Sequence, residues 1–166
     1  MSVLVLGVGN ILLSDEGIGV RVVEALEQRY EIPANLDVVD GGTAGMELLE
    51  MMSDRDQVII IDAVNTGAAP GTVVELRGEE VPALFRTRIS PHQLGISDLL
   101  GVLVVIDQMP KAMTLFGAVP YSLDTGIELT AAMQEKLEII LTFTVAELQR
   151  LGYDLVAKSV VLPEAV

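Results

Sequence analysis

The chain has 166 residues, of which 51% are hydrophobic, and a formal charge of -14 with only 10 basic residues. This length suits a single domain, 1–166, with a substantial core and is short for two. So few basic residues cannot form the positive face that nucleic acid, anionic lipid or phosphate-rich substrates require, whereas cations and basic partner segments suit the acidic charge.

The sequence contains no cysteine, which excludes disulfides, thiolate metal ligands and a cysteine nucleophile. Any metal site must therefore use oxygen and imidazole ligands. No basic residue precedes the first apolar run, and no run is long enough to span a bilayer. We therefore expect a cytoplasmic protein with neither nucleic acid nor membrane as a partner.

The first predicted element is a strand over residues 3–6, an aliphatic run rich in valine. Such a run is typical of a strand buried on both faces in a parallel sheet. A helix is predicted next, with Ser14 or Asp15 as its cap and with apolar residues at helical spacing. Asp15 and Glu16 thus lie at a strand-to-helix crossing, where open α/β sheets bind ligands.

A dinucleotide-binding turn is the alternative interpretation of this crossing, because Gly7 and Gly9 match the first two glycines of that fingerprint. Asp40, at the end of the next strand, could then bind the ribose. The third glycine position is Leu12, however, and the acids at the helix start would repel a pyrophosphate. We therefore favour a different ligand.

A second crossing follows the first. Residues 36–39 predict a short strand that stops at Asp40, a glycine-rich turn surrounds Thr43, and residues 46–52 resume a helical pattern. Asp40 therefore also falls at the end of a strand.

The strongest strand pattern is the β-branched run at residues 57–64, whose single charge, Asp62, stands at its C-terminal end. A carboxylate there suggests a functional site, although Asp62 could instead cap the following loop through its side chain. Residues 72–76 predict a further strand, whose direction could be antiparallel because no helix fits before it.

Residues 79–89 have mixed polarity and predict a surface segment, which leads to Ser90. Ser90 and Gln93 form a capping box that places His92 in the first turn of a helix running to about Asp107. A lone histidine is usually a surface or structural residue, but a helix N-terminus keeps its ring neutral and able to bind a metal or act as a base. The buried side of this helix consists of Leu99, Leu100 and Leu103.

The last predicted elements are a strand over residues 113–119 and a long helix capped by Thr130 and ended by Gly152. Residues 153–166 show no clear period and remain unassigned. Together the elements predict a single three-layer α/β domain built around a mostly parallel sheet.

Glu16, Asp62 and His92 each follow a strand or open a helix on the expected ligand-binding edge of the sheet. Two carboxylates and an imidazole are plausible ligands for a divalent transition metal. A serine hydrolase fits less well, because the nucleophile-elbow motif is absent and Ser90 is better explained as a cap.

Four ordered motifs resemble the endopeptidases that mature the large subunit of nickel-iron hydrogenases, especially the type serving uptake hydrogenases. They are GVGNILLSDEGIGVRVVEAL, DGGTAGMELL, IIIDAV and SPHQLGISDLL. The resemblance covers nearly the whole chain and implies the same three-layer α/β fold, with a twisted, mostly parallel sheet of about five strands flanked by helices. It also implies that the metal-binding residues are Glu16, Asp62 and His92, and that Asp40 is a further functional residue.

The resemblance implies a metal-dependent or aspartyl-type endopeptidase that removes the C-terminal extension of the large-subunit precursor. We expect nickel to arrive with the substrate, while other divalent cations could occupy the same site. Asp40 and Asp62 are the candidate catalytic residues that activate water. The alternative is a noncatalytic chaperone or binding module that senses a metallated partner.

Overall fold

The computed structural model describes residues 1–87 and 94–159. Five strands form its central sheet: β1 (Val3–Val8), β3 (Leu36–Gly42), β4 (Gln57–Ala63), β5 (Val73–Arg77) and β6 (Ala112–Ala118). Their order is β3-β1-β4-β6-β5. In this order β3, β1, β4 and β6 are parallel to one another, whereas β5 runs antiparallel to β6. The predicted sheet is confirmed.

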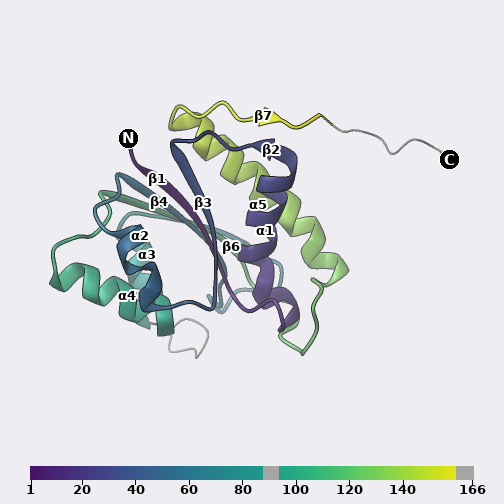
Figure 1. Cartoon of the computed structure of the whole chain (residues 1–166). Coiled ribbons are helices and arrows are strands. Elements are labelled where there is room, and N and C mark those ends of the chain that lie inside the picture. The colour runs from purple at the N-terminus through teal and green to yellow at the C-terminus, as the bar shows by residue number, and fades with distance from the viewer. Residues whose placement is uncertain (88–93, 160–166) are drawn as a thin grey trace.

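Helices cover both faces of the sheet (Figure 1). One face carries α1 (Ile18–Arg29) and α5 (Ala131–Arg150), and the other carries the short η2 (Met46–Leu48) and α2 (Leu49–Met52) with α3 (Glu80–Thr87) and α4 (Leu94–Val105). Each face has its own apolar cluster, so the fold has the three layers that the sequence predicts.

The first strand lies in the interior of the sheet, as predicted. Val3 and Val5 pack against the α1 and α5 side, while Leu4 and Leu6 pack against the other helices. All four side chains are fully buried. Because successive side chains of a strand point to opposite faces, a strand covered on both faces needs the continuous apolar run seen in the sequence.

The surface segment predicted at residues 79–89 is wrong over its described part, which forms α3. Val81 and Phe85 lie one helical turn apart and are both buried in the core on that side of the sheet. Pro82 is tolerated because it stands in the first turn, where backbone N–H groups have no partner inside the helix. The mixed polarity therefore reflected an amphipathic helix.

The later elements largely follow the predictions. Thr130 caps α5, with its hydroxyl oxygen accepting a hydrogen bond from Met133 N, and Leu99, Leu100 and Leu103 of α4 are buried. The tail contributes β7 (Val156–Ala157), which pairs with β2 (Tyr30–Glu31). No helix within the described residues is both long and apolar enough to cross a membrane.

Candidate functional site

Three of the predicted site residues meet at one edge of the sheet. Glu16 lies in η1 (Ser14–Gly17) directly after β1, Asp40 lies near the end of β3, and Asp62 lies near the end of β4. Because these strands are parallel and Gly7 of β1 pairs with Asp40, their carboxyl ends coincide. This confirms that Glu16 and Asp62 lie on the same edge.

Glu16 and Asp62 form a buried acidic pair, with exposed fractions of 5% and 2%. Burial raises the pKa of Glu16 to about 7. Burial also raises the pKa of Asp62 well above its usual value, and the neighbouring charge of Glu16 adds to the effect, against a hydrogen bond from the backbone of Ala63. Two ionised carboxylates held this way repel each other, so a proton or a cation between them is favourable.

Two glycines allow the chain to bring the pair together. Gly9 has a φ of 129°, and a Cβ there would collide with the Glu16 carbonyl oxygen and lie 3.7 Å from Asp62 Oδ1. A Cβ on Gly19, in the first turn of α1, would collide with the carbonyl oxygens of Val8 and Ile61. The turn after β1 and the start of α1 therefore lie directly against β1 and β4.

Asp15 has a role that the sequence did not reveal. It is fully buried, and its carboxylate accepts hydrogen bonds from Tyr121 N (3.0 Å), Ser122 N (3.2 Å), Thr130 N (2.8 Å) and Thr130 Oγ1 (3.1 Å). The predicted cap at Ser14 or Asp15 is wrong, because neither η1 nor α1 has a side-chain cap. Asp15 instead ties η1 to the loop after β6, through partners more than 100 residues away.

No local pattern could have shown which of two adjacent acids meets that loop and which meets Asp62. The sequence offered one indication, Thr130, which was expected to lie at the start of a helix. The backbone N–H groups at a helix start can donate hydrogen bonds to a nearby carboxylate.

A pocket of about 270 Å³ opens beside the acidic pair, between the turn after β1 and the turn after β3. Asp40 is exposed and lines it, and Asp40 Oδ1 accepts a hydrogen bond from Gly42 N at 2.9 Å. Gly9 borders both the pocket and the acidic pair. The remaining lining is mostly aliphatic: Ile11, Leu12 and Val20, with Asn10, Gly42 and Thr43.

The third predicted metal ligand, His92, lies outside the described residues, as does its capping box. Within residues 1–87 and 94–159, no three histidine, cysteine, aspartate or glutamate residues are grouped closely enough to hold a metal ion. The described part of the site is thus a pair of carboxylates next to a pocket, and the role of His92 stays a prediction.

The fold and site define an α/β protein with a buried acidic pair at the carboxyl edge of its sheet. A family model described as hydrogenase maturation protease matches residues 20–147. The hydrogenase 2 maturation protease of Escherichia coli is 51% identical over 162 residues, covering 97% of this chain and 99% of that protein. The chain belongs to the hydrogenase maturation protease family, which confirms the resemblance.

Other comparisons agree. The HupD hydrogenase expression/formation protein of Rhodobacter capsulatus is 38% identical over 154 residues, covering 92% of this chain and 73% of that protein. The solved hydrogenase maturating endopeptidase HybD of E. coli has a TM-score of 0.91 at 52% identity, covering 95% of this chain and 98% of that one. HybD of Thermococcus kodakarensis has a TM-score of 0.72 at 26% identity, covering 92% of this chain and 100% of that one.

Proposed function

We propose that this protein is an endopeptidase that removes the C-terminal extension of a nickel-loaded large-subunit precursor of a nickel-iron hydrogenase. Membership of the protease family supports the class of reaction. The observation that carries the metal part of the proposal is the buried pair of Glu16 and Asp62 beside an open pocket.

The donor set fits a divalent cation. Two buried carboxylates with raised pKa values gain most from a positive charge, because it removes both their repulsion and their desolvation cost. Glu16, Asp62 and His92 would offer three ligands and leave positions for ligands of the substrate. We therefore propose that nickel comes with the precursor as part of the substrate, and that these residues align the peptide and reject precursors without metal.

Hydrolysis adds water across the peptide bond, so one group must take a proton from the water and the leaving nitrogen must gain one. Asp62 is buried beside Glu16, whereas Asp40 is exposed on the pocket wall where water has access. We propose that one of these two carboxylates accepts the proton, with the bound metal available to polarise the water.

Cleavage of purified precursor tests this function. Wild-type protein should shorten the nickel-loaded precursor and leave the nickel-free precursor intact, as measured by mass spectrometry. At least one of Asp62→Asn and Asp40→Asn should slow cleavage at least about a hundredfold, in the range of a lost acid-base group, and the comparison of the two variants assigns the proton acceptor. Glu135→Gln, an exposed glutamate on α5, is the control and should cleave normally.

Equal cleavage of both precursors by metal-stripped enzyme would refute nickel recognition. Tight binding of the loaded precursor without any shortened product would instead support the noncatalytic chaperone alternative.

Cation affinity tests the ligand set separately. Calorimetric titration with nickel should show at least about tenfold weaker binding for Glu16→Gln and for His92→Ala, because each removes one ligand. Glu135→Gln again serves as the control. Unchanged affinity in both variants would place the cation site elsewhere.

A further inference from the structure

The outer edge of β3 is a free sheet edge. β3 is seven residues long and ends the strand order, so it pairs with β1 on one side only within the described chain. In Figure 1 it runs between the two helix layers. A long uncovered edge is a ready partner for another extended segment, and proteins normally shorten or cover such edges. The uncovered edge of β3 therefore suggests that another segment binds there.

The direction of the backbone groups on β3 follows from a neighbouring strand. Gln57 N donates to Ser2 O at 3.0 Å, so it points from β4 toward β1. Gln57 shares its face with Ile59, which packs in the α1 and α5 cluster, as Val38 does. In parallel strands, residues on the same face point their N–H and C=O groups the same way. The N–H and C=O groups of Val38 therefore point outward from β3.

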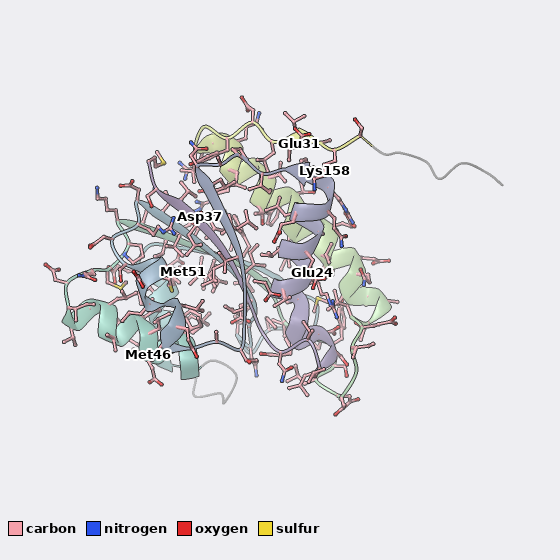
Figure 2. The ribbon with its side chains drawn as sticks, in the orientation of Figure 1. Glu24, Glu31, Asp37, Met46, Met51 and Lys158 are labelled. Atoms are coloured by element: carbon pink, nitrogen blue, oxygen red, sulfur yellow. The ribbon has the colours of Figure 1, made fainter. Side chains whose placement is uncertain are left out.

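The two flanks of this edge differ in chemistry. On one side lie Met46 and Met51, which are 50% and 41% exposed, and on the other side lies Glu24 of α1 (Figure 2). The side chain of Asp37 is held by an ion pair with Arg55, at 2.6 Å. An added strand would therefore place alternate side chains against the exposed methionines on one face and, on the other, against Glu24, which is paired with Arg21 at 3.1 Å.

The edge also leads to the site. Strands are spaced by about 4.8 Å, so a segment added outside β3 lies about 10 Å from β1 and about 14 Å from β4, which carries Asp62. The end of β3 forms one wall of the pocket, through Asp40, Gly42 and Thr43. About four extended residues would cross from the added strand to β4 and Asp62.

We propose that an extended segment of the precursor's C-terminal region binds as an additional strand on the free edge of β3 and passes through the pocket to the acidic pair. This proposal rests on the proposed function. The backbone hydrogen bonds of β3 would supply affinity, while Met46 and Met51 would favour apolar side chains on the face of the segment that meets them.

A proline at Val38 tests the proposal. Val38→Pro removes an N–H that points outward and leaves the bonds between β3 and β1 in place, which is where edge strands tolerate proline. The variant should raise KM for the nickel-loaded precursor about tenfold with kcat nearly unchanged, because binding loses a backbone hydrogen bond and meets a steric block. Thermal unfolding reports whether the variant folds.

Glu75→Pro on the opposite edge is the matched control. Thr72 O accepts from Val119 N, and Gly78 N donates to Met113 O, so alternate residues of β5 face β6 and Glu75 faces outward. This variant should cleave the precursor with normal KM.

A second measurement does not depend on either variant. Amide hydrogen exchange of wild-type protein, with and without the nickel-loaded precursor, should show protection at Val38 and none at Glu75. Wild-type cleavage with an unchanged KM in folded Val38→Pro, or protection at Glu75 instead of Val38, overturns the edge proposal alone. Absence of cleavage by wild-type protein would contradict the proposed function. The hydrogen-exchange experiment would still test whether a segment binds to the edge of β3.

Discussion

Asp15 and Glu16 are neighbours with the same charge and opposite surroundings. Asp15 accepts four hydrogen bonds from the loop after β6, so its charge is compensated although it is fully buried. Glu16 is nearly as buried, and burial raises its pKa to about 7 beside Asp62. The surroundings of Asp15 are therefore set by donors from distant parts of the chain.

The raised pKa of Glu16 predicts a pH-dependent difference in stability. A carboxyl group whose pKa rises from 4.5 to about 7 on folding costs nothing below pH 4.5 and destabilises the fold as pH rises through 7. Glu16→Gln does not ionise. With a chelator present, the free energy of unfolding of Glu16→Gln relative to that of wild type should increase by about 2 to 3 kcal/mol between pH 4.5 and pH 8.

Urea unfolding across this pH range measures the difference. Glu27 is an exposed glutamate on α1, so the free energy of unfolding of Glu27→Gln should differ from that of wild type by the same amount at every pH. Parallel curves for Glu16→Gln as well would show that Glu16 ionises normally in the folded protein.

The elements around the site are held by close backbone packing and by the Asp15 anchor. Gly19 lets the first turn of α1 touch β1 and β4, and Asp15 joins η1 to the loop that precedes α5. The two contacts act on opposite sides of Glu16, so they set its position from both directions.

Gly19→Ala should displace α1 from the sheet. The new Cβ would meet backbone oxygens of Val8 and Ile61, which cannot move aside like a flexible side chain. We expect a loss of about 3 kcal/mol in the free energy of unfolding. Gly101→Ala, in α4, meets nothing within 4 Å and should stabilise by about 0.5 to 1 kcal/mol, since alanine favours a helix. Similar effects at both sites would argue against the close approach.

Asp15→Asn should loosen the loop after β6. The amide group cannot accept all of the hydrogen bonds of the carboxylate, so buried donors lose their partners at a cost of about 2 kcal/mol. Hydrogen exchange should speed up at Tyr121 and Ser122. Asp124→Asn removes a charge from the same loop and should change stability by less than about 0.5 kcal/mol. Unaltered exchange in Asp15→Asn would contradict the anchor.

At the scale of the whole molecule, different acidic groups change the stability of the fold in opposite directions as the pH rises. Glu147 is buried between Arg150 and Arg77, and hydrogen bonds from these two lower its pKa to about 2. Its contribution to stability is present above pH 4.5 and disappears as pH falls toward 2. Glu16 and Asp62 act in the opposite direction as pH rises, and the formal charge of -14 adds repulsion.

The metal-free protein should therefore be most stable near about pH 5. Calorimetry in chelator should show a Tm that falls on both sides of this pH. About 0.5 M sodium chloride should reduce the fall toward pH 8 only in part, because salt screens surface repulsion far better than a buried pair. A Tm that keeps rising to pH 8 would contradict this balance. Saturating nickel should reduce the alkaline loss, since a cation relieves the acidic pair.

Local patterns predicted most of the elements correctly. The aliphatic runs that became β1 and β4 are covered on both faces, and the helical spacing of α4 and α5 matches their buried sides. These features depend on neighbours within a few residues, as burial on one face or two imposes a period on the chain. The positions of Glu16, Asp40 and Asp62 on one edge followed too, because parallel strands end together.

Tertiary structure alone decided the rest. Which of Asp15 and Glu16 meets Asp62 depends on donors at Tyr121 and Thr130, more than 100 residues away. Residues 80–87 form a helix because Val81 can be buried in the apolar cluster on that face of the sheet. The free edge of β3 results from the order in which the strands pair. Such contacts are set by the packing of distant segments, which no local pattern encodes.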